Sequence, residues 1–362
     1  MWNFFNPVKL VFGIGALDRI GELVRGRPYG LVTYGDPFFS ELTERISQLA
    51  GTPGIVINDV SPNPGFESLA VSCDRLASNG RSPEIIVAVG GGSAIDTGKV
   101  LAASGGDFSR VRECLETGEG GERLKPLPLI AIPTTAGTGS EVTRFATVWD
   151  HLEKKKYSLA LDSSYPEYAL VDPVLSQQAP RDLTISTGVD ALSHALESIW
   201  NVNANPISSH LCVFAAKEVL LALPLLSKNL DNLDLRLRMA RAATMAGLGM
   251  SYTQTALAHT LSYPFTLNYG VPHGIACSFC LPMVMQRAIG SNPECDSTLE
   301  KIFGPDLEAG VEQLSDFLLD LGISTSPEDY GMEKKEWSAL VQTAIGSGLG
   351  KNFVGRDVTP AT

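Results

Sequence analysis

EIIVAVGGGSAIDTGK, residues 84 to 99, passes from an apolar, β-branched run through glycines into a stretch with helical character. A strand, a glycine-rich turn and a helix in succession are typical of α/β folds. Glycines let the backbone approach a phosphate, and the free N–H groups at a helix start favour negative charge. The stretch is not GxGxxG, and such turns also occur for steric reasons. It indicates an α/β fold, and it favours a phosphate site without establishing one.

The rest of the chain predicts two domains of different kinds. Further strand-like runs lie at 9–13, 29–35, 54–59 and 128–135, and helical patterns follow at 38–51 and 67–80. Beyond residue 181 the periodicity is helical, at 182–200, 208–226, 233–250, 298–304 and 314–323. Alternating strands and helices predict a parallel sheet with helices on its faces. We therefore expect an α/β domain over 1–180 and an all-α domain over 181–362, with the boundary near Pro173 and Pro180.

Composition excludes several classes of protein. The 362 residues carry a formal charge of -12, which argues against a nucleic-acid or membrane partner bound through a basic face. We recognise no signal peptide and no apolar run of the roughly 18 residues that a membrane span needs, so a cytoplasmic protein is expected. The six cysteines fit reduced thiols. Cys277 and Cys280 form a single CxxC in an apolar run, which favours buried core thiols.

A second loop is rich in hydroxyl groups. IPTTAGTGSEVT, residues 132 to 143, follows a predicted strand and supplies Thr134, Thr135, Thr138, Ser140 and Thr143. Such a loop can wrap a nucleotide, or it can be a helix cap with turn glycines. Two loops at the ends of strands in one parallel sheet point to a shared crevice.

GVDALSHALE, residues 188 to 197, places Asp190 and His194 four positions apart, on one face of a predicted helix. Alone, such a pair is more often a hydrogen-bonded core histidine than a metal site. His259 and His273 lie in the same helical half, one on a predicted helix and one beside a turn. One carboxylate and three imidazoles make a plausible site for Fe²⁺ or Zn²⁺. His151 and His210 have polar neighbours and no such pattern.

Four motifs in this order make the chain similar to the iron-dependent (group III) alcohol dehydrogenases: GGGSAIDTGK, PTTAGTGSEVT, GVDALSHALE and AHTLSYPFTLNYGVPHG. The resemblance covers roughly residues 1 to 290. It implies an α/β dinucleotide-binding domain, a helical metal-binding domain, Fe²⁺ (or Zn²⁺) bound by Asp190, His194, His259 and His273, and NAD(H) or NADP(H) as cofactor. It also implies cofactor-binding roles for the following residues of this sequence: Asn63, Gly91, Gly92, Ser93, Asp96, Thr134, Thr135, Thr138, Thr143 and Lys156. Phe145 falls near the nicotinamide end, and Lys156 could equally lie in a solvated turn.

Two departures from the family pattern affect the proton donor and the cofactor. Many relatives have a histidine four residues after the third ligand, whereas this chain has Tyr263, so the proton would come from water or from a hydroxyl relay that includes Tyr263. Relatives that select NAD often have an aspartate directly after VT at the end of the second strand, but here the order is VTYGD. Either Asp36 binds the ribose hydroxyls, which favours NADH, or the turn leaves room for the 2′-phosphate of NADPH.

The resemblance implies an aldehyde reductase, and within it the sequence is similar to the phosphonoacetaldehyde reductases. A phosphonate would need local cations, for which Arg144 and Lys351 are candidates, the latter in a glycine-rich tail able to close over an anion. A pocket lined by Phe145 and Tyr263 would instead suit a neutral aldehyde such as lactaldehyde. The motifs are also compatible with a maleylacetate reductase, a dehydroquinate synthase-like lyase or a silent metal- or nucleotide-binding protein. Each of these functions is compatible with a homo-oligomer.

Overall fold

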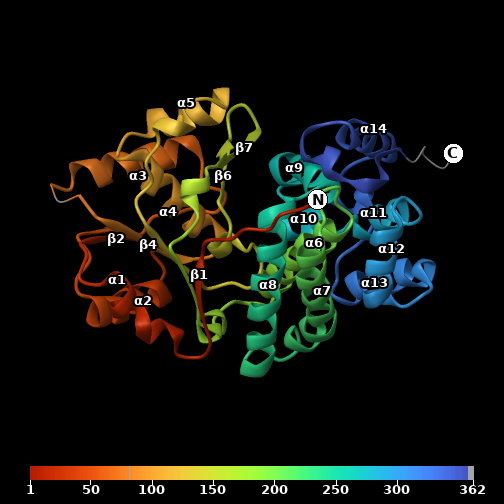
Figure 1. Cartoon of the computed structure of the whole chain (residues 1–362), viewed down its shortest axis with the longest axis horizontal. Helices are drawn as coiled ribbons and strands as arrows, with labels where there is room; N and C mark the ends of the chain where they lie inside the picture. Colours follow the sequence, from red (N-terminus) through yellow and green to blue (C-terminus); the bar gives the residue numbers. More distant parts are fainter. Residues whose placement is uncertain (81, 358–362) are drawn as a thin grey trace. The chain divides into compact units, whose positions relative to one another are not determined.

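The computed structural model describes residues 1–80 and 82–357, which form two compact units (Figure 1). The α/β unit comprises Asn6–Thr135 and Ser140–Gln178. The helical unit comprises Met1–Phe5, Ala136–Gly139 and Ala179–Thr362. A parallel sheet in one unit and helices in the other confirm the predicted fold class.

A six-stranded parallel sheet forms the centre of the α/β unit, in the order β1-β8-β5-β4-β2-β3. Its strands are β1 (Lys9–Phe12), β2 (Tyr29–Val32), β3 (Ile55–Ile57), β4 (Ile85–Gly90), β5 (Leu129–Pro133) and β8 (Tyr168–Val171). All six residues of β4 are buried. Because strand side chains alternate between faces, Ile86 and Ala88 enter one core while Ile85, Val87 and Val89 enter the other.

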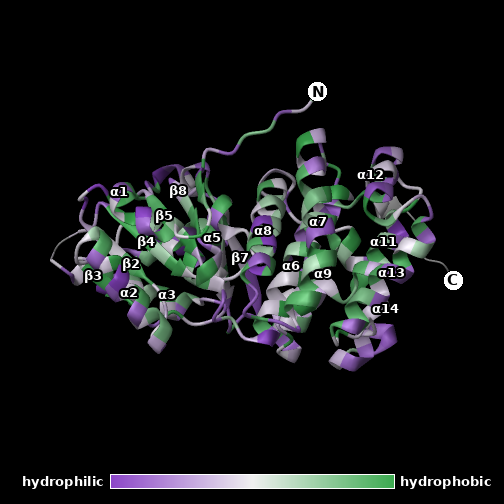
Figure 2. Ribbon diagram, turned by 90° about the horizontal axis from the view of Figure 1, so that it is seen from below, coloured by the Kyte–Doolittle hydropathy of each residue, from purple (hydrophilic) through white to green (hydrophobic). Residues whose placement is uncertain are grey.

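Helices cover both faces of this sheet (Figure 1). One face packs against α1 (Ile20–Val24) and α2 (Pro37–Ala50). The other packs against α3 (Phe66–Ser78), α4 (Gly92–Ser104) and α5 (Phe108–Thr117). Figure 2 shows hydrophobic colouring along the strands, as burial on both faces requires.

Sequence patterns did not predict three strands of this unit. β8 pairs with both β1 and β5. β6 (Phe145–Asp150) and β7 (Lys155–Ala160) form a separate antiparallel hairpin. The hairpin carries three consecutive lysines, Lys154 to Lys156, where one would expect a solvated turn, and only one of its faces contributes to the core.

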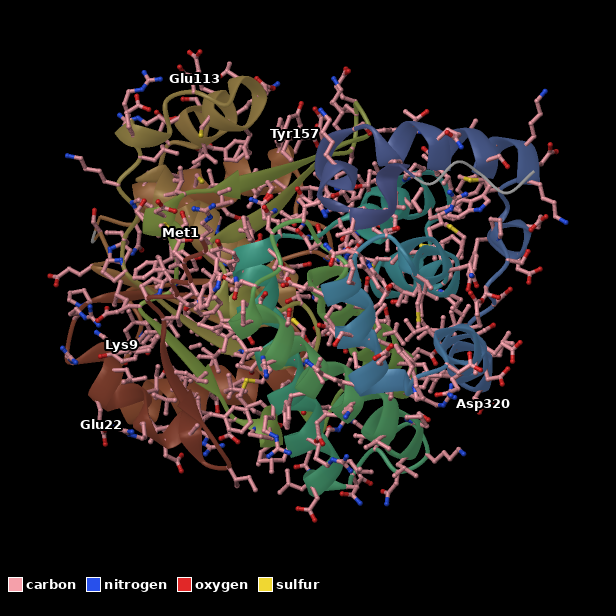
Figure 3. The ribbon with its side chains drawn as sticks, turned by 45° about the vertical axis from the view of Figure 1, so that its right-hand side comes forward. Met1, Lys9, Glu22, Glu113, Tyr157 and Asp320 are labelled. Carbon is pink, nitrogen blue, oxygen red and sulfur yellow. The ribbon has the colours of Figure 1, made fainter. Side chains whose placement is uncertain are left out.

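The helical unit is built around α6 and the two long helices that pack against it. Its helices are α6 (Arg181–Ile199), α7 (Pro206–Leu226), α8 (Leu233–Thr253), α9 (Leu257–Tyr269), α10 (His273–Ser278), α11 (Leu281–Ala288), α12 (Pro293–Phe303), α13 (Leu307–Asp320) and α14 (Lys334–Ile345). Figure 3 shows charged side chains such as Asp320 pointing away from the ribbon. The buried side chains of α6, α7 and α8 form one hydrophobic core with the later helices.

Helix α7 is more apolar than the sequence analysis recognised. It is long and apolar enough to cross a membrane, with a mean hydropathy of 1.6 (Figure 2). Lys217 and Glu218 interrupt it, and Cys212, Ala215 and Val219 on its inner side are buried in the core. We therefore describe it as a core helix of the unit, because its buried side packs against α6 and α8.

The helical unit also includes two short segments that the sequence analysis placed in the first domain. The N-terminal residues join it because the Phe4 ring packs on Tyr252 and the Tyr252 hydroxyl donates to Asn3 Oδ1. Residues 136–139 join it through glycines. A Cβ on Gly139 would lie 2.5 Å from the Cα of Gly247, so only glycine permits this approach.

The glycine-rich tail is anchored as far as the structure describes it. Its 3-10 turns are η7 (Gly348–Asn352) and η8 (Val354–Asp357). Phe353 is fully buried in the core, and the Asn352 side chain donates to the Thr255 carbonyl. The expected loose, closing tail is therefore not found among residues 346–357; residues 358–362 lie outside the described residues.

Candidate functional site

The four predicted metal ligands come together in the helical unit. Asp190 and His194 lie one turn apart on α6, His259 is near the start of α9, and His273 is the first residue of α10. Gly274 allows this arrangement, because a Cβ there would lie 1.9 Å from the Ser186 carbonyl oxygen on α6. The close packing of α10 on α6 thus brings His273 beside the aspartate.

The distances suit a shared cation. Asp190 Oδ1 lies 3.6 Å from His259 Nε2 and 3.8 Å from His194 Nε2. The rings of His194 and His259 stack at 4.7 Å, and those of His259 and His273 lie edge to face at 5.4 Å. His259 Nε2 is buried without a hydrogen-bond partner. A buried, unpaired nitrogen facing a carboxylate is costly unless something binds it, so these donors fit a divalent metal.

Glu197, a residue that the sequence analysis did not select, orients His259. Its side chain is 1% exposed, and Oε2 lies 2.5 Å from His259 Nδ1. Its other oxygen accepts from the backbone N–H of Ala258, 2.5 Å away, in the first turn of α9. The carboxylate therefore caps α9 and directs Nε2 toward Asp190, as in the carboxylate–histidine–metal arrangement.

The electrostatics of the cluster favour a cation. Burial would raise the pKa of Asp190, but His194, His259 and His273 hold it well below its usual range. Burial lowers the pKa of His194 to about 4, so this ring is neutral. Burial would also lower the pKa of His259, yet Cys277, Glu197 and Asp190 keep it well above its usual value. A carboxylate and neutral imidazoles are the forms that bind metals, and the negative surroundings of His259 call for positive charge.

Cys277 also lies in this cluster. Its Sγ is 3.3 Å from Asp190 Oδ1 and donates to the His273 carbonyl, 3.0 Å away. Ligand atoms of Asp190, His259, His273 and Cys277 all lie within 4.8 Å of one another. Both cysteines of the CxxC are buried, as predicted, but only Cys280 belongs to the hydrophobic core cluster.

The predicted phosphate loop lies at the start of α4. Gly91 is the N-cap and Gly92 the first helical residue. Gly90 has φ of +151°, and a Cβ there would lie 2.6 Å from the Tyr34 ring, so the turn requires glycine. Asn63 meets this loop, because its backbone N–H donates to Ser93 Oγ at 3.2 Å. These residues leave a helix N-terminus suited to an anion.

Residues of the threonine loop divide between the two units. Thr134 and Thr135 are in the α/β unit, where a Cβ on Gly91 would lie 3.5 Å from Thr135 Oγ1. Thr138 belongs to the helical unit. Thr143 is buried, and its hydroxyl lies 3.4 Å from Lys99 Nζ. The Thr143 hydroxyl is therefore directed toward the buried Lys99.

Asp96 is engaged by the protein itself. One of its oxygens accepts from Ser140 Oγ at 2.5 Å and the other from the Thr147 N–H at 2.9 Å. Lys99, one turn further along α4, donates to Ser140 and to the Phe145 carbonyl. Asp96 and Lys99 thus join α4 to the segment that leads into β6.

Arg144, Phe145 and Lys156 lie on or beside the β6–β7 hairpin. Arg144 forms an ion pair with Asp162, and its guanidinium carbon is 5.6 Å from the centre of the Phe145 ring. Lys156 Nζ is 5.7 Å from the centre of the Trp149 ring across the hairpin. The guanidinium of Arg144 is therefore already paired with a carboxylate of the α/β unit.

The last three predicted residues are on separate elements. Tyr263 is partly buried on α9, one turn after His259. Asp36 is exposed at the N-cap of α2 and makes no capping hydrogen bond with its side chain. Lys351 is exposed on η7.

An α/β unit with a glycine turn and a helical unit with a buried carboxylate–imidazole cluster are the parts of a metal-dependent dehydrogenase. The profile of the family described as "Iron-containing alcohol dehydrogenase" matches residues 7–173. That of "Fe-containing alcohol dehydrogenase family, C-terminal" matches residues 184–357. The chain belongs to the iron-containing alcohol dehydrogenase family and is an oxidoreductase.

Individual relatives span nearly the whole chain. Long-chain-alcohol dehydrogenase 1 of Geobacillus thermodenitrificans is 31% identical, covering 94% of this chain and 89% of the relative. Sulfoacetaldehyde reductase of Bilophila wadsworthia is 28% identical, covering 94% and 92%. The structure of sulfoacetaldehyde reductase from Bifidobacterium kashiwanohense in complex with NAD⁺ matches with a TM-score of 0.89 and 29% identity, covering 98% and 94%. The predicted family and reaction class are confirmed.

Proposed function

We propose that this protein reduces a small aldehyde with an anionic group to the alcohol, using NAD(P)H. Phosphonoacetaldehyde, reduced to 2-hydroxyethylphosphonate, is the favoured substrate. The observation that carries the proposal is the cluster of Asp190, His194, His259 and His273, the first three buried and the last partly buried, in a chain of this family. Likeness to two sulfoacetaldehyde reductases supports the anionic group, because sulfoacetaldehyde and phosphonoacetaldehyde are both two-carbon aldehydes with an anionic end.

Asp190, His194, His259 and His273 would hold Fe²⁺, or Zn²⁺, in the helical unit. Bound there, the metal supplies Lewis acidity toward the carbonyl oxygen as hydride arrives from the nicotinamide. Glu197 keeps His259 in the ligand orientation. Tyr263, one turn from His259 on α9, offers its hydroxyl for the proton that the new alcohol requires.

Cofactor binding is assigned to the turns of the α/β unit. The pyrophosphate would lie against Gly91, Gly92 and Ser93 at the start of α4, with Asn63, Thr134 and Thr135 beside it. The proposed set also includes Asp96, which follows this turn on α4, Thr138 and Thr143, which follow Thr135 in the threonine loop, and Lys156 on β7. Asp36 follows β2, is exposed, and does not use its side chain to cap α2. Its carboxylate favours NADH because it would repel a 2′-phosphate.

Arg144 and Lys351 are the proposed cations for the anionic group. Arg144 already pairs with Asp162, so the anionic group of the substrate would replace the Asp162 carboxylate as the acceptor of the guanidinium N–H groups. Lys351 is exposed on a turn whose backbone is anchored next to it through Asn352, which would limit the positions open to its ammonium group. Phe145, the residue after Arg144, would offer an apolar ring to the substrate.

The test compares aldehydes by following NADH absorbance. We expect kcat/KM for phosphonoacetaldehyde to exceed that for propionaldehyde by at least ~100-fold, because one or two charge-assisted contacts in the transition state contribute ~3 kcal/mol. Sulfoacetaldehyde and NADPH belong in the same series. Arg144→Ala and Lys351→Ala should lower the ratio, while Lys335→Ala, an exposed lysine on α14, should not. Equal values for charged and neutral aldehydes would refute the anionic substrate.

The second candidate is a reductase of a neutral aldehyde such as lactaldehyde. The observation that favours it is the Arg144–Asp162 ion pair, in which a carboxylate already balances the charge of the arginine. If the substrate is neutral, Asp162→Asn should not improve phosphonoacetaldehyde reduction. A rise in that activity on removing Asp162 would favour the anionic substrate instead.

A further inference from the structure

Cys277 lies among the predicted metal ligands. It lies one turn after His273 on α10, and its side chain is fully buried. Four ligand atoms lie within 4.8 Å of one another, one each from Asp190, His259, His273 and Cys277. His194 is not one of these four. The structure therefore contains a second set of four donors that overlaps the family set and replaces an imidazole by a thiol.

Two of the separations among these donors fit a coordination tetrahedron. With bonds of roughly 2.0–2.3 Å, neighbouring ligand atoms of a tetrahedral zinc site lie roughly 3.3–3.8 Å apart. Cys277 Sγ lies 3.3 Å from Asp190 Oδ1, and His259 Nε2 lies 3.6 Å from the same oxygen. The thiol is thus as close to the shared carboxylate oxygen as a ligand should be.

A second, independent observation points into the same space. His259 is 2% exposed, and its Nε2 has no hydrogen-bond partner. Glu197 holds the opposite ring nitrogen, so the ring is fixed with the unpaired nitrogen toward Asp190. Together with Cys277, this nitrogen forms a buried site that a soft divalent cation would complete.

We propose that, when the site holds Zn²⁺, Cys277 binds the metal as a thiolate in place of His194, together with Asp190, His259 and His273. The S–H bond breaks as the metal–sulfur bond forms, the proton leaves to solvent, and nothing is oxidised. Because thiolate ligands favour Zn²⁺ over Fe²⁺, Cys277 would shift the preference of the site toward zinc. This inference rests on the metal site of the proposed function, but it concerns the ligand set and not the reaction.

X-ray absorption at the zinc edge of the Zn²⁺-loaded wild-type protein tests the ligand set without any substitution. We expect one sulfur at about 2.3 Å beside nitrogen and oxygen ligands at about 2.0–2.1 Å. Bound zinc with nitrogen and oxygen ligands alone would overturn the Cys277 assignment and leave the proposed metal site standing. Failure of the wild-type protein to bind zinc or iron would overturn both.

Substitutions then measure the preference. Losing a partner outside the ligand set typically costs 10–100-fold in metal affinity, so losing a ligand should cost at least about tenfold. We expect Cys277→Ser to lose at least that in Zn²⁺ affinity and much less in Fe²⁺ affinity, measured by chelator competition. Cys280→Ala is the matched control, since Cys280 is buried in the neighbouring hydrophobic core. Equal losses for both metals, or for both variants, would contradict the proposal.

Discussion

At the scale of single residues, Glu197 connects the fold to the metal site. It lies on the same helix as Asp190 and His194, yet both of its oxygens accept hydrogen bonds from α9. One accepts from a backbone N–H in the first turn and the other from the His259 ring. A buried carboxylate is costly unless it is fully paired, and here the pairing holds the imidazole in one tautomer. Its effect on metal binding should therefore be large even though it is not itself a proposed ligand.

We predict that Glu197→Ala weakens metal binding 10–100-fold, because His259 loses its orientation and the α9 N–H loses its acceptor. Glu197→Gln keeps an acceptor oxygen and should lose less. Chelator competition measures both affinities. Asp182→Asn, at the exposed start of the same helix, is the control and should bind metal as the wild type does. Unchanged affinity in Glu197→Ala would mean that His259 is oriented by its backbone alone.

At the scale of secondary structure, Lys99 links α4 by hydrogen bonds to the segment that leads into β6. It is 1% exposed, and its ammonium donates to Ser140 and to the Phe145 carbonyl. Burial lowers the pKa of Lys99 to about 8, against the pull of Asp96 and Glu141. Burial likewise raises the pKa of Glu141 to about 6, although Lys99 opposes it. One buried cation therefore interacts with two carboxylates, the buried Glu141 and the partly buried Asp96.

We predict that Lys99→Met lowers the free energy of unfolding by about 3–5 kcal/mol at pH 7, where Lys99 is charged and Glu141 ionised, since it leaves Glu141 and Asp96 without a cation. The sign of the pH dependence follows from Glu141. Its folded pKa lies above its usual value, so stability is lost as pH rises through about 6, and removing Lys99 should deepen that loss. The defect should thus be smaller at pH 5. Chemical denaturation measures it, with the exposed Lys155→Met as control, and equal defects at both pH values would contradict the argument.

Sequence patterns predicted many of the helices and strands but not the contacts between residues far apart in the sequence. The runs 84–99 and 182–200 contain their own periodicity, so β4, α4 and α6 were predictable. β8 was not, because its pairing with β1 and β5 joins distant segments. The metal cluster could be assembled from an i, i+4 pair and two later histidines. Cys277 also has a signal, four positions after His273 on a helix, but Glu197 contacts His259 across two helices.

At the scale of the whole molecule, each unit has its own hydrophobic core and each is assigned its own ligand. Residues of the helical unit make one core cluster, and the two faces of the sheet make the other two. The metal donors all lie in the helical unit, and the glycine turn lies in the α/β unit. Metal binding should therefore stabilise first the elements that carry the donors. α10 should respond most, because its six residues include His273 and Cys277.

We predict that Zn²⁺ slows amide hydrogen exchange in α10 and the first turn of α9 by up to about 100-fold. A ligand at 100 times its dissociation constant stabilises the binding form by about 2.7 kcal/mol, and exchange through local opening slows by the same factor. Strand β4, in the α/β unit, should change less. His259→Ala should abolish the effect because it removes a proposed ligand, whereas His210→Ala, an exposed histidine on α7, should preserve it. Exchange measured by mass spectrometry with and without chelator decides the matter: protection that is equal in α10 and β4, or that survives His259→Ala, would place the metal elsewhere.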